Sequence, residues 1–267
     1  MSSYLSYMKK IFQDQKINLA LLVLFCFLFE WAFAWVFFET DIKKTLASII
    51  KLLPPGITAF MGIQGGISQF ALQMLAFGYV HPLILIVLSF FQISIPARYL
   101  AGEIQFKTFD ILLTKPVRRI TIPLGIYSFL AVALALQFSA MLLGTLAGDL
   151  SFDLKVNMAD YAGAAGAGLV FFLSMGSLAT AISAFQSDQG KSIRMAVGLF
   201  VSLYFFDTVI KLSTSLQSLS PYSYFQLYQP GDLILGEPGT GIRVLISLGI
   251  TVLCFLISLV QFNRRDL

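Results

Sequence analysis

Few side chains in this sequence combine the types and the spacing that chemistry requires. Gly190, Lys191 and Ser192 copy the end of a phosphate-binding P-loop, whose lysine and hydroxyl groups hold nucleotide phosphates and magnesium. That motif also needs a glycine where the sequence has Phe185, and a β-strand where it has an apolar run. The sequence therefore predicts no nucleotide site here, and the run Ala162–Gly168 predicts close helix packing rather than a dinucleotide loop.

Metal-binding and hydrolytic groups are also too few for a catalytic site. The chain has one histidine and two cysteines, and Cys26 and Cys254 both lie in apolar runs. This set predicts neither a zinc site nor a disulfide framework. Asp207 lies within an apolar run, and Lys211 follows at the four-residue spacing of a simple ion pair. We therefore expect a non-catalytic chain with no metal and no cofactor of its own.

Glu30 is harder to assign, because it lies past the middle of the first apolar run. An ionised carboxylate at such a depth costs about 3 kcal/mol and usually faces a partner or a water-filled path. Two interpretations stay open for Glu30. It either makes a structural hydrogen bond inside the protein or belongs to a substrate path.

Composition defines the solvent that surrounds these residues. Hydrophobic residues make up 57% of the chain and charged residues 12%, with a mean hydropathy of +0.82. About a quarter of a typical soluble domain is charged, so this chain is predicted to be an all-α polytopic membrane protein. The net charge of +4 is small and scattered. We therefore expect membrane lipid around the chain and no nucleic acid partner.

Six apolar runs approach or exceed the length of about 20 residues that a bilayer requires. We treat residues 1–267 as a single transmembrane domain, with spans at about 17–38, 82–100, 122–147, 161–185, 192–212 and 242–262. The segment 39–81 is expected on the extracytoplasmic side, and its part 55–79 is either fully outside or half-inserted. Pro96 can kink the second span. With both termini cytosolic, the cytosolic segments carry twice as many Lys and Arg residues as the outer ones, which favours this orientation.

The longest charged segment, Gly102–Arg119, lies between the second and third expected spans. Glu103 stands where a carboxylate stabilises a helix start, and Lys107 follows at an i,i+4 spacing that suits an ion pair. Pro116 is expected to end the helix.

The predicted helix has one apolar side, formed by Phe106, Phe109, Leu112 and Leu113. A short amphipathic helix between two spans can dock in the groove of a partner. It can also lie as a solvated loop at the membrane surface. Both interpretations stay open from the pattern alone.

The same segment resembles the signature of permease subunits in the type-2 export family of ABC transporters. The similar residues are Gly102–Glu103, the run TFDILL at 108–113, the run PVRR at 116–119, and the closing RRDL at 264–267. Lys107 departs from the pattern, because the family usually has a glycine there.

The resemblance implies a permease subunit of an ATP-driven exporter in a bacterial or archaeal inner membrane. In that family two six-span permeases, identical or related, pair with two cytosolic ATP-binding subunits, and accessory extracytoplasmic or membrane subunits can join them. ATP and magnesium would be bound in the partner. The segment after the second span would be a coupling helix seated on the ATPase, and Tyr4–Gln15 would form an amphipathic helix along the inner surface.

The resemblance also implies roles for individual residues of the coupling segment. Contacts to the ATPase, or the positioning of its surface, would come from Glu103, Thr108, Asp110 and Arg119, and buried anchors from Phe106, Phe109 and Leu113, with Gly102 and Pro116 bounding the helix. Two other functions stay open: a membrane anchor for an ATPase that does mechanical or assembly work, and an ATP-independent channel or carrier. Apolar spans would line a cavity suited to lipids, drugs or hydrophobic peptides.

Overall fold

The computed structural model describes residues 3–39, 75–107, 119–154 and 156–265. These residues are helical and contain no strand. The elements are α1 (Ser3–Glu39), α5 (Pro82–Pro96), the π-helix η1 (Ala97–Gly102), α6 (Glu103–Gln105), α8 (Thr121–Phe152), α9 (Met158–Ala184), α10 (Gln189–Leu212), the 3-10 helices η2 (Thr214–Tyr222) and η3 (Tyr224–Leu227), α11 (Pro230–Ile234) and α12 (Thr240–Asn263).

Six helical segments in the described residues are long and apolar enough to cross a membrane. They are Leu5–Val36, Leu75–Gln105, Thr121–Phe152, Met158–Ala184, Gln189–Leu212 and Thr240–Asn263. The prediction of an all-α, multi-pass membrane protein with six spans is confirmed. The second of these segments includes residues 75–78, before the expected start at 82, because these residues are already helical.

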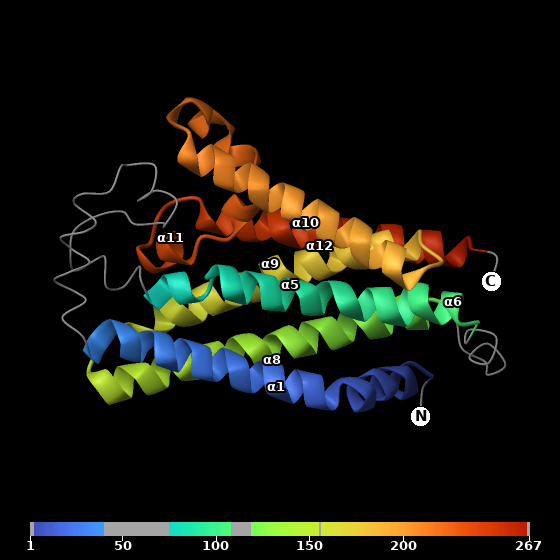
Figure 1. Ribbon diagram of the computed structural model, residues 1–267, viewed down its shortest axis with the longest axis horizontal. Coiled ribbons are helices and arrows are strands. Elements are labelled where there is room, and N and C mark those ends of the chain that lie inside the picture. Colours follow the sequence, from blue (N-terminus) through green and yellow to red (C-terminus); the bar gives the residue numbers. More distant parts are fainter. Residues whose placement is uncertain (1–2, 40–74, 108–118, 155, 266–267) are drawn as a thin grey trace.

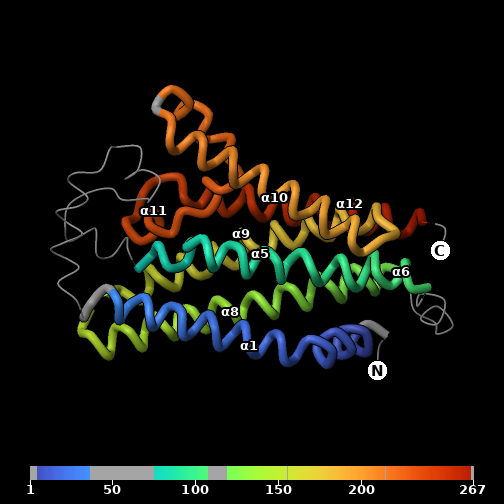
Figure 2. The backbone as a smooth tube through the Cα atoms, viewed as in Figure 1, coloured from blue at the N-terminus to red at the C-terminus, as the bar shows by residue number. Residues whose placement is uncertain are grey.

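The long helices form an elongated bundle whose first and last described residues lie at the same end (Figure 1). We call this the terminus end and the opposite one the far end. Helices α1 and α8 run side by side along the whole bundle. Helix α10 leans away from α5 as it approaches the far end, so the two helices diverge there (Figure 2).

Helix α1 has no break between the expected surface helix and the first span. Its 37 residues correspond to about 55 Å of helix, well beyond the roughly 30 Å of a hydrocarbon core. Tyr7, Ile11, Gln15 and Leu19 recur every four residues and are all buried. The segment Tyr4–Gln15 is thus helical and forms the first part of α1, with its buried side packed against the bundle.

The close contact of α1 and α8 depends on glycine. A Cβ atom at Gly144 would lie 2.5 Å from the carbonyl oxygen of Phe27, and one at Gly148 would collide with Ala34. The four-residue spacing of these two glycines is the small-residue pattern that lets transmembrane helices approach closely. In the run Ala162–Gly168, only Gly168 makes such a contact, since Gly163 and Gly166 have open space beside them.

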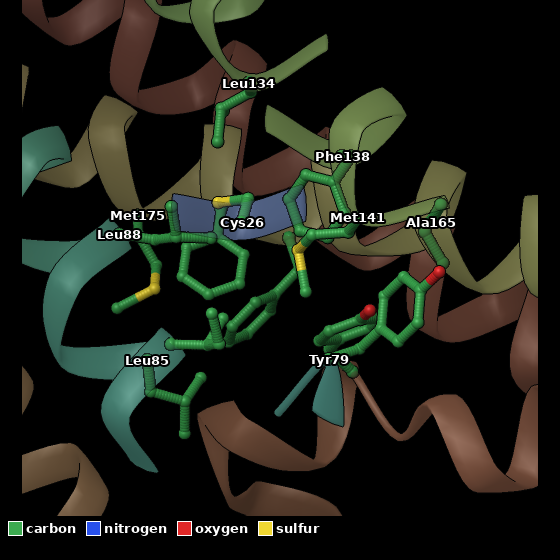
Figure 3. Close-up of a cluster of buried hydrophobic side chains, with 14 of the residues drawn as sticks. Cys26, Tyr79, Leu85, Leu88, Leu134, Phe138, Met141, Ala165 and Met175 are labelled. Carbon is green, nitrogen blue, oxygen red and sulfur yellow. The ribbon is translucent and has the colours of Figure 1, made fainter. Parts of the chain in front are cut away.

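The core lies between α1, α5, α8 and α9 and is built from apolar side chains of all four (Figure 3). Its labelled members include Cys26, Leu85, Leu88, Leu134, Phe138, Met141 and Met175. A second buried cluster, which contains Tyr7, Tyr99 and Phe262, lies toward the terminus end. Both clusters are continuous across helices, so the helices are held together by close packing at the centre of the bundle and at the terminus end.

Candidate coupling surface

Helix α5 enters the candidate site through the π-helix η1 and the single turn of α6. Pro96 has no backbone N–H to donate, and η1 begins at the next residue, Ala97. The sequence predicted a kink at Pro96, and the structure has a six-residue π-helical segment there instead of a simple bend. Such segments are frequent at functional sites.

Tyr99 of η1 joins the second span to α1. The Tyr7 hydroxyl donates to the Tyr99 carbonyl oxygen at 3.0 Å, and Gln15 Nε2 donates to the Tyr99 hydroxyl at 3.2 Å. The Tyr99 hydroxyl donates in turn to Asp14 Oδ2 at 3.2 Å. Because Tyr99 is 1% exposed, these bonds are shielded and fix the N-terminal part of α1 against η1.

Glu103, the first residue of α6, forms a salt bridge with α1. Lys10 Nζ lies 3.0 Å from Glu103 Oε1, and the glutamate side chain is 14% exposed. The sequence predicted Lys107 as the partner through an i,i+4 helical pair. The expected helical register is not kept, because α6 ends at Gln105.

Gln105 connects residues 102–105, which we call the joint, to the fifth span. Its Oε1 accepts a hydrogen bond of 2.9 Å from the backbone N–H of Gln189, the first residue of α10. Gly102 lies against the same residue, since a Cβ atom there would be 3.0 Å from Gln189 Oε1. Residues 102–105 therefore contact the first span through Lys10 and the fifth span through Gln189.

Lys107 has a left-handed backbone conformation, with φ of 54°. This contradicts the prediction of one continuous helix from Glu103 to Pro116. A β-carbon disfavours the left-handed region by about 1–2 kcal/mol, and glycine avoids this cost. The position at which the sequence departs from the family pattern is thus one whose backbone conformation suits a glycine.

Lys107→Gly is expected to stabilise the protein by about 1 kcal/mol, because it removes the left-handed strain. The measurement is the free energy of unfolding in mixed detergent micelles. The control is Gln105→Gly in α6, where the backbone is helical and glycine should destabilise. A Lys107→Gly protein less stable than the parent would contradict the assignment.

Arg119 lies on the other side of the coupling segment and binds the chain's own C-terminal region. Its Nη1 donates to the Arg265 carbonyl oxygen at 2.6 Å. Arg265 Nη1 donates to the carbonyl oxygens of Ala184 at 3.1 Å and Gln186 at 2.6 Å, and its Nη2 donates to Ser187 Oγ at 2.7 Å. These bonds tie the segment that enters α8 to the end of α12 and to the turn between α9 and α10.

Exposed apolar side chains surround this joint at the terminus end. Phe106, expected to be an anchor, is 67% exposed. Phe185 and Ile120 are also exposed, at 54% and 43%, and sequence reasoning did not assign them to the site. The signal for Phe185 was its place just after an apolar run, beside the polar turn that begins at Gln186. The other expected site residues, Thr108, Phe109, Asp110, Leu113 and Pro116, lie outside the described residues.

Glu30 is fully buried, far from the coupling surface. Neither of its carboxylate oxygens has a hydrogen-bond partner within the described part of the chain, so the expected structural hydrogen bond is not found there. Both oxygens lie close to Gly78, where a Cβ atom would be 2.6 Å from Glu30 Oε1.

Six long apolar helices in the described residues, joined at one end by a compact polar and cationic surface, define a multi-pass membrane protein. A comparison with protein families gives a match to the ABC-2 family transporter protein over residues 3–267. The chain therefore belongs to the ABC-2 transporter family. No curated protein matches the sequence.

Proposed function

We propose that this chain is the permease subunit of an ATP-driven exporter and binds a separate ATP-binding subunit through its terminus end. The observation that supports this most directly is the meeting of the first, second and fifth spans at residues 102–105. A protein that pushed on this segment would act on all three spans at once. Membership of the ABC-2 family supports the same function.

Force would pass through short, specific contacts. The Lys10–Glu103 salt bridge leads to α1, and the Gln105–Gln189 hydrogen bond leads to α10. The Arg119–Arg265 bond extends the joint to α12. A bound ATPase can shift the permease between two conformations only by as much as it binds one of them more tightly. Contacts that differ between those states are expected in this joint.

The proposed complex contains two cytosolic ATP-binding subunits and a second permease copy, identical or related. ATP and magnesium would be bound in the ATP-binding subunits. The residues proposed to couple this chain to the ATP-binding subunits, by contact or by shaping the segment, are Gly102, Glu103, Phe106, Thr108, Phe109, Asp110, Leu113, Pro116 and Arg119. Both termini would then be cytosolic in an inner membrane, and accessory extracytoplasmic or membrane subunits could bind at the far end.

Of the two interpretations of Glu30, we propose the role in the substrate path. Glu30 would take this role only in a second conformation of the permease. In this structure its side chain has no exposed surface. A solute could reach Glu30 if α1 moved away from Gly78 and Gly144, the two glycines that Glu30 lies against. Such a movement of α1 is the one that the Lys10–Glu103 salt bridge would transmit.

Phe106→Asp is expected to lower permease-dependent ATP hydrolysis at least about tenfold, or 1.4 kcal/mol. Phe106 is exposed in the isolated chain, so the change should leave folding intact, whereas a carboxylate buried in an interface costs several kcal/mol. The measurement is ATPase activity of the co-purified complex in vesicles. The control is Leu150→Asp, at an exposed position at the far end of α8.

Full ATPase activity in Phe106→Asp would contradict the docking role. Solute uptake into inverted vesicles separates an exporter from an ATPase anchor. ATP-dependent accumulation supports export, and ATP hydrolysis that depends on the permease but moves no solute supports an anchor. Solute flux that needs no ATP would identify a channel or carrier.

A further inference from the structure

A groove of about 300 Å³ runs between α5 and α10. It is lined by apolar residues of both helices, among them Leu85, Ile93, Val197 and Phe200, and bounded by Phe225 of η3. The one polar side chain from α5, Ser89, donates to the sulfur of Met175 at 3.8 Å. The wall of the groove is therefore almost entirely hydrocarbon.

The groove continues at the far end into a smaller space of about 70 Å³ with a different character. The two spaces share Pro82, Leu85, Tyr204 and Phe225. The smaller one adds four polar residues: Asp207, Thr208, Lys211 and Gln229. The hydrocarbon-lined groove, which we also call the trough, thus opens at one end onto these four polar residues, which we call the rim.

The rim offers hydrogen-bond donors chiefly through Lys211. Asp207 accepts from Ser223 Oγ at 2.5 Å and pairs with Lys211 Nζ at 2.9 Å, so its charge is compensated. The side-chain amide of Gln229 donates a hydrogen bond to the Phe225 carbonyl oxygen. An ammonium group has three N–H donors, and the Lys211 side chain is 21% exposed, so it can also bind an anionic oxygen.

The length of the groove suits an acyl chain. From Pro82 to Ile93 the wall is about 16 Å long at 1.5 Å per residue, roughly half of a hydrocarbon core of about 30 Å. The groove is apolar along this length, and the polar residues lie at one end. Its wall therefore matches an acyl chain whose polar head group lies at that end.

We propose that the groove between α5 and α10 binds a single-chain amphiphile, with its acyl chain along the trough and an anionic phosphate or carboxylate head group at Lys211. This would name the substrate class of the proposed exporter, and in that respect it rests on the proposed function. Binding itself requires neither ATP nor the ATP-binding subunit. Failure of one proposal is therefore distinguishable from failure of the other.

The test uses the full chain in nanodiscs with a diazirine-labelled palmitic acid as probe, and photolabelled peptides are identified by mass spectrometry. Saturable labelling is expected on α5 and α10. Ser89→Phe, which fills the trough, should lower it at least tenfold. Val252→Phe, on an exposed position of α12, should leave it unchanged. Unsaturable labelling, or equal labelling in the two variants, would overturn the site.

Competition identifies the head group. Dodecyl phosphate and dodecanoate should displace the probe more strongly than neutral dodecyl maltoside, and the stronger of the two anions defines the head group. The double variant Asp207→Asn, Lys211→Met removes the ion pair as a unit and should abolish that preference. Equal displacement by the neutral compound would refute the anionic assignment. In a Val201→Cys variant, a disulfide can join two copies of the chain. If this disulfide forms and blocks labelling, the groove is occupied by the second copy instead.

Discussion

Gly144→Leu is expected to prevent α1 and α8 from packing and to destabilise the protein by about 3 kcal/mol, the upper part of the range for overpacked sites. The backbone atoms that the new side chain meets are the Phe27 carbonyl oxygen and the Trp31 nitrogen, 2.5 and 3.2 Å from its Cβ, and the Glu30 Cβ lies 2.9 Å away. Backbone atoms inside a helix cannot rotate away as a side chain can. The two helices must separate instead.

The measurement for Gly144→Leu is the free energy of unfolding in mixed micelles, together with the yield of monodisperse protein. The control is Gly163→Leu on α9, because a Cβ atom at Gly163 meets nothing within 4 Å. That variant adds the same side chain to another long helix and should be about as stable as the parent. Equal stability of both leucine variants would show that α1 and α8 do not pack through Gly144.

Arg265→Ala is expected to destabilise the terminus end by about 3 kcal/mol, because it removes three hydrogen bonds from a charged donor. The carbonyl oxygens of Ala184 and Gln186 lose a partner, and the end of α12 separates from the turn between α9 and α10. The readouts are unfolding free energy and amide hydrogen exchange at residues 184–189. Faster exchange is expected there, with little change in α8.

Arg264→Ala is the matched control, since Arg264 is the neighbouring arginine and its side chain is exposed. Exposed substitutions of this kind usually change stability by less than about 0.5 kcal/mol. Arg265→Lys should recover only part of the loss, because an ammonium group cannot reproduce the planar fork that reaches three acceptors. If alanine at 264 and at 265 had the same effect, the assigned role of Arg265 would be wrong.

The helices were predictable from the sequence, and their ends were less so. Long apolar runs without charge require a bilayer, and a bilayer requires helices, so the number and order of the spans followed from composition. The continuity of α1 was not predicted, because the family resemblance implied a separate surface helix at Tyr4–Gln15, a segment that carries Lys9 and Lys10. Their charged groups can extend from a helix that is buried on its other side at Tyr7, Ile11 and Gln15.

The segment Gly102–Arg119 was singled out from the sequence, but its contacts were not predicted. An i,i+4 rule considers only neighbours along one helix, and the residue that pairs with Glu103 is 93 positions away in α1. Arg265 likewise binds a turn about 80 positions before it in the chain. The end of α6 depends on the backbone of Lys107, which no residue-type preference predicts. Such contacts require the packed fold, and the sequence alone does not specify which distant residues meet.

The docking of an ATP-binding subunit at the terminus end is tested most directly by site-specific photocrosslinking in the assembled complex. A benzoylphenylalanine at position 106 should capture the ATP-binding subunit, and the same group at position 150 at the far end should not. Capture from position 106 that disappears when the partner is omitted is the predicted result. Capture from position 150, with none from position 106, would contradict the account.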